Sequence, residues 1–422
     1  MRSKQSKGYM VENFWFLKLK PLWAYFKSES LAFKAISAYM FVEYFRPQSI
    51  FPIIDFLPWA QLFLCVALVS VFSDKKADMN WTRLHTVILL FAVSIHLSFL
   101  VAFDIDSSKR NYKFFIQWII VFFLVSSIVT NRERFYSFFL VIFLCSLKIA
   151  FGTTRIWVSR GFSFTTWGLT GPPGYFQNSG ELAILMLTLF PLGYYLFRYH
   201  AKDLNKLEKI VLFLATICPA LTILGASSRG AQIALGVQLV IIFWKKLYKP
   251  KSLLLLAIVI WLGFNFLPDE QKQRFSEIGE DKTSIQRQLY WKNGWEMMKD
   301  HPVLGVGFYN FVPYYNTYYR HDILYSSAQL PHNIFVQIGT DGGFLSLFFY
   351  VGILLLSVTY RFPLKQINSV SDKILYAIWK GNRLSIIGFI IAGQFVSVGY
   401  YPFLWICLGI QVGITNSIKS RQ

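Results

Sequence analysis

The stretch PHNIFVQIGTDGGFLSLFFYVGILLLSVTY, residues 331–360, places one of only six histidines directly before a long apolar run. A run of about 20 apolar residues can cross the roughly 30 Å hydrocarbon core of a bilayer as a helix. Because lipid offers no hydrogen bonds, the backbone must satisfy its own, as a helix does. This stretch therefore predicts a transmembrane helix with His332 at its mouth.

Similar apolar runs recur along the whole chain, which has 422 residues and is 55% hydrophobic and 15% charged. That composition is too apolar for an ordinary soluble domain. We therefore expect an all-α polytopic membrane protein with about twelve transmembrane helices. Hydropathy and helix breakers place these spans at residues 30–46, 50–72, 84–103, 112–130, 134–151, 178–197, 207–225, 230–247, 250–267, 334–360, 374–397 and 401–417.

The same pattern divides the chain into four parts. Residues 1–29 form a predicted interfacial helix, 30–267 hold nine spans with an outer loop at 152–177, 268–331 form a long outer segment, and 332–422 hold the last three spans. Lys and Arg concentrate in the segments predicted to lie inside, which favours cytoplasmic termini. The net charge of +20 thus mostly reflects the orientation of the chain in the membrane, and no nucleic-acid partner is expected.

The long outer segment carries seven Lys and Arg and eight Asp and Glu, so its charge is nearly balanced. Within it, SIQRQLYWKNGWEMMKDHP (284–302) has apolar residues at helical spacing and predicts an amphipathic helix. Long non-spanning segments of compact proteins are usually functional. The segment 268–331 and the loop 152–177 are therefore candidates for substrate contact.

Three polar residues stand out, each with two interpretations. Arg229 lies between apolar spans, where an unpaired guanidinium costs at least about 2.5 kcal/mol, so it either anchors a helix end at the headgroups or binds an anion. Arg287 either faces solvent and lipid phosphates or joins Arg229 in holding a pyrophosphate. His332 is either a hydrogen-bonding residue at a helix start or a general base.

Metal and cofactor chemistry find little support in the sequence. Glu181, Asp300, Asp322 and Asp341 are scattered, and the four cysteines fall inside predicted spans without metal-ligand spacing. Neither a GxSxG elbow nor a phosphate-binding P-loop occurs. We therefore expect no metal and no cofactor, and the patterns argue against a hydrolase or an ATP-driven pump.

Three separated motifs resemble the shared core of one known superfamily. They are SSRGAQIAL (227–235), RQLYWKNGWEMMKDHPVLGVGFYNF (287–311) and PHNIFVQIGTDGGFLSLFFYVGIL (331–354). In order and spacing they are similar to the O-antigen ligase and polymerase superfamily of bacterial envelope glycosyltransferases. The resemblance covers roughly residues 165–360. It implies a GT-C-like fold in the bacterial inner membrane, with the active site facing the periplasm.

The resemblance also implies an activity and residues for it. A glycan would pass from undecaprenyl pyrophosphate to a hydroxyl of lipid A core or of a growing polysaccharide, by a metal-independent, inverting reaction. Arg229 and Arg287 would bind the pyrophosphate, and His332 would activate the acceptor. Besides membrane lipids, the expected partners are therefore this donor and a lipid or glycan acceptor. Further candidates for substrate contact are Asn333, Arg155, Arg160, Tyr175, Tyr314 and Tyr315, whose aromatic members either stack on sugars or anchor at the membrane interface.

Two alternatives stay open at this point. The sequence does not separate a ligase from a polymerase within the superfamily. From a different class, twelve spans also fit a transporter. Transporters commonly contain repeated halves with interrupted helices near the midplane, and the sequence shows no such pairing.

Overall fold

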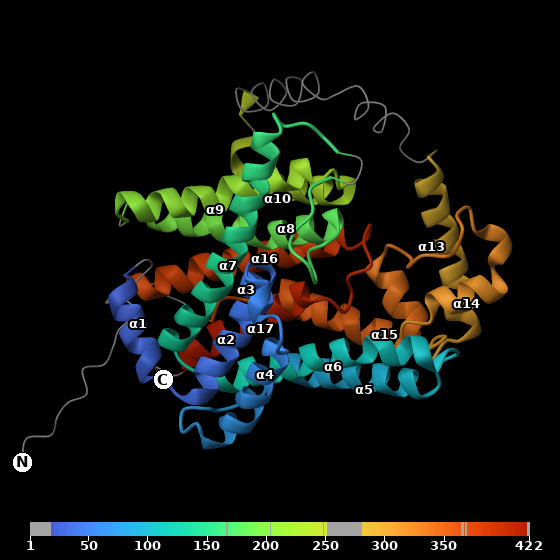
Figure 1. Ribbon diagram of the computed structural model, residues 1–422, viewed down its shortest axis with the longest axis horizontal. Helices are drawn as coiled ribbons and strands as arrows, with labels where there is room; N and C mark the ends of the chain where they lie inside the picture. Colours follow the sequence, from blue (N-terminus) through green and yellow to red (C-terminus); the bar gives the residue numbers. More distant parts are fainter. Residues whose placement is uncertain are drawn as a thin grey trace, which may run out of the picture.

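The computed structural model describes residues 18–165, 168–202, 204–247, 249–250, 281–363, 367 and 369–419 (Figure 1). Within these ranges the regular elements are helices, which confirms the predicted all-α class. The longer ones are α1 (Leu19–Ser28), α2 (Leu31–Phe45), α4 (Trp59–Ser70), α5 (Arg83–Leu100), α6 (Ile105–Ile128), α7 (Arg132–Ser159), α8 (Ser179–His200), α9 (Lys206–Gly225), α10 (Arg229–Leu247), α13 (Lys282–Asp300), α14 (Phe311–Tyr318), α15 (Ile334–Val358), α16 (Val370–Ala392) and α17 (Pro402–Lys419).

Among the described helices, seven are long and apolar enough to cross a membrane: α5, α6, α7, α8, α9, α15 and α16. They confirm a polytopic helical membrane protein, whereas the predicted count of about twelve spans is not confirmed. Helices α2, α4, α10 and α17 coincide with predicted spans but do not belong to the seven. The predicted span 250–267 falls outside the described residues except at its first position, and the interfacial helix at 1–29 is described only from residue 18, mostly as α1.

Side-chain caps determine where several helices begin. Asn178 accepts a hydrogen bond from the backbone N–H of Gly180 (2.8 Å) ahead of α8, and Ser369 accepts one from Asp372 N–H (3.1 Å) ahead of α16. At α9 the exchange is reciprocal, because Asn205 N–H donates to the Glu208 carboxylate (3.0 Å) and Glu208 N–H donates to the side-chain oxygen of Asn205 (2.9 Å). These short polar residues satisfy backbone donors that the first turn leaves unpaired.

Two predicted boundaries are wrong. The span predicted at 50–72 is broken by two prolines. Pro52 begins the 3-10 turn η2 (Pro52–Ile54), and α4, with 12 residues, begins only after Pro58 and is continued by the 3-10 turn η3 (Val71–Ser73). Proline removes a backbone donor and ends helices. Conversely, α7 continues for 28 residues to Ser159, so the loop predicted at 152–177 begins later.

Helix α15 is interrupted at Gly343, whose φ of 68° and ψ of −173° are not helical. The turn after α13 packs into this break. Phe344 N–H donates to Pro302 O (2.8 Å), and Val306 N–H donates to Thr340 O (2.8 Å). A side-chain carbon at position 343 would overlap the backbone of Val303, so glycine is required there. The described part of the long segment is thereby fixed to α15.

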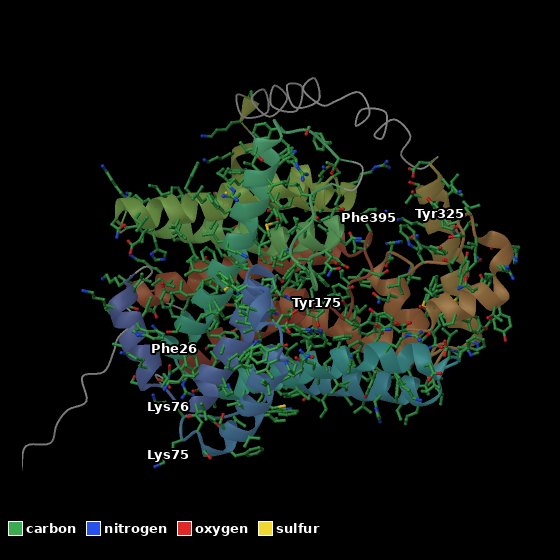
Figure 2. The ribbon with its side chains drawn as sticks, in the orientation of Figure 1. Phe26, Lys75, Lys76, Tyr175, Tyr325 and Phe395 are labelled. Carbon is green, nitrogen blue, oxygen red and sulfur yellow. The ribbon has the colours of Figure 1, made fainter. Side chains whose placement is uncertain are left out.

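A buried ion cluster joins α7 to two connections at the opposite end of the bundle. Arg134 pairs with Glu29 (2.7 Å) and with Asp74 (2.8 Å), and Lys76 also contacts Glu29 (2.7 Å). The Arg134 side chain has no exposed surface. Figure 2 shows Phe26 and Lys76 at this end, far from Tyr325 at the other. The cluster therefore ties the first helices to α7.

Replacing Arg134 with Met should leave Glu29 and Asp74 without their buried cation. We expect the free energy of unfolding to fall by about 3–5 kcal/mol, measured by chemical denaturation in mixed micelles. The matched control is Lys299→Met, which removes an exposed pair with Glu296 and should change stability by about 1 kcal/mol or less. Equal effects of the two substitutions would contradict a stabilising cluster.

Candidate functional site

The backbone at His332 is fixed by a contact from a distant segment. His332 has a left-handed φ of 53°, a conformation that non-glycine residues adopt rarely. Its N–H donates to Ser397 Oγ (2.8 Å) in the connection between α16 and α17. The next residue, Asn333, accepts from Phe335 N–H (2.9 Å) and Val336 N–H (3.3 Å) and so caps α15. The sequence Pro-His-Asn therefore places the imidazole at a defined helix entrance.

The imidazole of His332 is half-buried and neutral at pH 7. Burial, aided by the positive charge of Arg287, lowers the pKa of His332 to about 4. Its Nε2 lies 3.3 Å from Oε1 of Gln329. A carbonyl oxygen only accepts, so this contact requires the proton on Nε2 and leaves the Nδ1 lone pair available. Nδ1 is therefore the ring atom that can accept a proton.

Arg287 lies on α13, so the predicted amphipathic helix at 284–302 is confirmed as a helix. Its Nε is buried and has no hydrogen-bond partner among the residues that the structure describes. Burial lowers the pKa of Arg287, opposed by the charge of Asp281 and reinforced by that of Arg229. A guanidinium nevertheless stays charged at neutral pH. Because an unsatisfied buried donor costs about 1–3 kcal/mol, this site favours an anion.

Arg229, the first residue of α10, is joined to the same region by Asp281. Its guanidinium lies 3.2 Å from the Asp281 carboxylate, and the two side chains are 33% and 19% exposed. Asp281 also caps α13 by accepting from Thr283 N–H and Ser284 N–H (both 3.1 Å). One carboxylate thus connects the helices that carry the two arginines. The structure therefore brings together Arg229, Arg287 and His332.

The other candidates lie in different surroundings. Arg155 and Arg160 are exposed at the last turn of α7 and just beyond it. Tyr314 is half-buried, and its hydroxyl contacts His301 Nε2 (3.1 Å). Tyr315 has no exposed surface and accepts a hydrogen bond from Asn293 (2.8 Å), so its ring offers no face to a sugar. Packing among residues 281–331 therefore explains the position of Tyr315.

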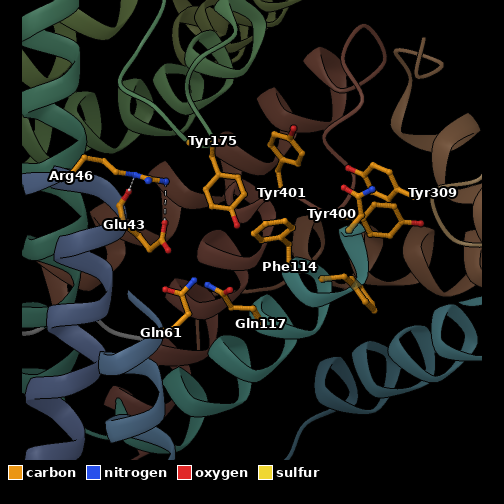
Figure 3. Close-up of a pocket in the computed structure, with 12 residues that line it drawn as sticks. Glu43, Arg46, Gln61, Phe114, Gln117, Tyr175, Tyr309, Tyr400 and Tyr401 are labelled. Carbon is orange, nitrogen blue, oxygen red and sulfur yellow. Dashed lines mark hydrogen bonds and ion pairs between the residues drawn. The ribbon is translucent and has the colours of Figure 1, made fainter. Parts of the chain in front are cut away.

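Tyr175 does not lie with Arg229 and Arg287. It lines a separate cavity with Glu43 and Arg46 (Figure 3). Asn333 lies beside His332, but its side-chain oxygen is engaged in capping α15. The expected substrate contacts therefore fall into two groups: those near the arginines and histidine, and those around the cavity.

Sequence reasoning missed three residues that position this site. Asp281 could have been found, because Asp followed by Thr and Ser two and three residues later is a helix N-cap pattern. No comparable sequence pattern marks Gln329 or Ser397. Ser397 is 65 positions from His332, and its role depends on a tertiary contact.

Two family models match the chain. Residues 214–351 match the O-antigen ligase family, which confirms the resemblance to that superfamily. Residues 24–201 match a family of unknown function (DUF5935). No curated protein matches the chain. Arg229, Arg287 and His332 all lie within the first matched range.

Substituting Arg287 with Met should raise the pKa of His332, because the arginine charge disfavours the protonated imidazole. The measurement is the pH dependence of diethyl pyrocarbonate modification at His332, followed by peptide mass spectrometry, since the neutral ring is the reactive form. The midpoint should move to higher pH. Lys292→Met, which removes an exposed charge from the same helix, should leave it unchanged. An unchanged midpoint in Arg287→Met would contradict the electrostatic contact.

Proposed function

We propose that this member of the O-antigen ligase and polymerase superfamily transfers a glycan from undecaprenyl pyrophosphate to an acceptor hydroxyl. The observation that supports it best is the buried Nε of Arg287, which has no hydrogen-bond partner within the described parts of the chain and lies within electrostatic reach of Arg229 and of the neutral His332. Two guanidinium groups beside one uncharged base match a reaction that combines an anionic leaving group with a hydroxyl nucleophile.

In this proposal the arginines act on the leaving group. Guanidinium pairs bidentately with phosphate oxygens and cannot lose its charge at neutral pH. Negative charge grows on the pyrophosphate oxygen as the bond to the anomeric carbon breaks, and the fixed cations stabilise that charge. Because Arg229 and Arg287 supply this stabilisation, the proposed reaction requires no divalent cation.

His332 acts on the nucleophile. Its Nδ1 takes the proton of the acceptor hydroxyl while the hydroxyl oxygen attacks the anomeric carbon from the face opposite the pyrophosphate. One C–O bond forms, one C–O bond breaks, and undecaprenyl pyrophosphate leaves with the electron pair. A single displacement inverts the anomeric configuration. The acceptor is lipid A core for a ligase or a growing polysaccharide for a polymerase.

The proposed location follows from the charge pattern. The described residues of 281–331 hold the site beside the starts of α10 and α15, and this segment has nearly balanced charge. Segments rich in Lys and Arg would face the cytoplasm. The site would then face the periplasm of a bacterial inner membrane, with both termini in the cytoplasm. This orientation also places it where lipid-linked glycans would be used.

Transfer from a purified lipid-linked donor, assayed with EDTA, tests the proposed reaction. We expect full activity of the wild type in EDTA and a loss of about 10²- to 10⁴-fold in His332→Ala, because general-base catalysis contributes that much. Arg287→Met should also be strongly impaired. His301→Ala removes an exposed histidine and serves as the matched control. Full activity in His332→Ala would refute the role of His332 as the base. Inactivation by EDTA would refute the claim that the reaction requires no divalent cation.

The pH dependence gives a separate test of the base. The pKa of His332 is lowered, so the neutral, active form persists above about pH 4 and is lost as pH falls through that value. We therefore expect kcat/KM, which reports ionisation in the free enzyme, to stay constant from pH 7 to about 5 and to decline below. An acid limb near the ordinary imidazole value of about 6.5 would mean that His332 does not have the environment described.

A further inference from the structure

A cavity of about 390 Å³ (Figure 3) has a lining that includes none of Arg229, Arg287 and His332. This volume is within the range of about 300–1,000 Å³ that is usual for small-molecule sites. The walls come from the end of α2, the start of α4, the first half of α6, the loop before α8, and two segments of the other half of the chain. The lining includes Glu43, Arg46, Gln61, Gln117, Tyr175 and Tyr401.

Planar polar groups form one side of this cavity. The Arg46 guanidinium lies 3.3 Å from the Glu43 carboxylate, and the two side chains are 18% and 9% exposed. The amides of Gln61 and Gln117 point toward one another nearby (Figure 3). Such a set can both donate to and accept from hydroxyl groups, and the paired charges leave no net demand for an ionic ligand.

Aromatic rings form the other side. Tyr175 and Tyr401 pack edge to face with ring centroids 5.6 Å apart. The Tyr175 hydroxyl accepts from Trp118 Nε1 (3.1 Å), and burial raises its pKa to about 12, so it keeps its proton. Aromatic rings with a polar tip present an apolar face together with a hydrogen-bonding group. An acyl chain would offer no hydrogen bonds to the polar side of the cavity, whereas a sugar ring matches both sides.

The loop before α8 is shaped around Arg46. Gly174 has a φ of 105°, which favours glycine, and a side-chain carbon there would overlap the Arg46 guanidinium. Arg46 itself has a left-handed φ of 56° at the end of α2. Two unusual backbone positions therefore lie at this part of the cavity wall, as is common at binding sites. The guanidinium itself is held by Glu43, because it donates to the backbone oxygen (3.1 Å) and to the carboxylate (3.3 Å) of that residue.

A short connection joins this cavity to the candidate site. The chain from Gly393 to Tyr401 contacts the start of α15 three times: Ile334 N–H donates to Gly393 O (2.8 Å), His332 N–H to Ser397 Oγ (2.8 Å), and Gly399 N–H to the side chain of Gln337 (3.1 Å). The same connection then supplies Tyr400 and Tyr401 to the cavity. A ligand held there would lie against the segment that positions His332.

We propose that this cavity is a saccharide-binding subsite, which receives one sugar residue of the glycan that the proposed reaction uses. Glu43 and Arg46 bind its hydroxyls, and Tyr175 and Tyr401 contact its ring. The inference rests on the proposed function for the source of the glycan. It also gives a role to the residues that match a family of unknown function, because Glu43, Arg46 and Tyr175 belong to that range.

Direct binding tests the subsite without requiring transfer. The probe is the free oligosaccharide released by mild acid from the lipid-linked glycans of the producing strain, titrated calorimetrically into protein in nanodiscs. Glu43→Gln and Arg46→Met should each weaken binding by about ten-fold or more, as expected for hydrogen bonds to charged groups. Glu296→Gln, in an exposed pair of the same spacing, is the matched control and should bind like the wild type. Unfolding midpoints establish that the variants are folded.

His332→Ala separates this inference from the proposed function. It should bind the oligosaccharide with wild-type affinity while its transfer activity falls by about 10²- to 10⁴-fold. Binding by the wild type that weakens in Glu43→Gln and Arg46→Met supports the subsite, even if no transfer is found and the proposed function fails. The subsite is overturned if the wild type does not bind, or if Glu43→Gln and Arg46→Met both bind with wild-type affinity, even if transfer occurs.

Discussion

The docking of the α16–α17 connection onto the start of α15 is the constraint on which both sites depend. Three hydrogen bonds, to Gly393, Ser397 and Gly399, hold residues 393–401 against residues 332–337. The first satisfies the N–H of Ile334, a first-turn donor that α15 leaves unpaired, and the other two satisfy the backbone N–H groups of His332 and Gly399. The same contact fixes the left-handed backbone of His332 and presents Tyr400 and Tyr401 to the cavity. The proposed catalytic site and the proposed saccharide subsite are therefore held by the same connection.

Charge balance gives the arginine site its character. Two guanidinium groups in one region repel, and Asp281 is the carboxylate that pairs with Arg229 while capping α13. Because it neutralises only one positive charge, the pair of arginines keeps a net positive charge for an anionic ligand. The partial exposure of Arg229 and Asp281 allows a phosphate group to compete for Arg229, whereas the buried Nε of Arg287 has no described competitor. In this account, ligand binding completes the site.

Much of this could be predicted from the sequence, where local patterns suffice. Apolar runs and helix breakers located most helices, and residue type with motif spacing led to the prediction of Arg229, Arg287 and His332, which the structure places in one region. Prediction was wrong where local rules compete: the prolines at 52 and 58 shorten the second span, and the apolar run of α15 conceals its break at Gly343. Ser397 and the Glu43–Arg46 cavity could not be predicted, because they arise from contacts between segments far apart in the chain. Tyr315 shows the same limit, since its burial follows from tertiary packing.

The central claim is that Arg287 holds the pyrophosphate while His332 takes part only in proton transfer. The most direct measurement is the affinity of nanodisc-embedded protein for undecaprenyl pyrophosphate itself, compared between Arg287→Met and His332→Ala. The account predicts that Arg287→Met weakens binding by about ten-fold or more, because it loses charge-assisted hydrogen bonds, and that His332→Ala binds like the wild type. Equal affinity of Arg287→Met and the wild type would contradict it.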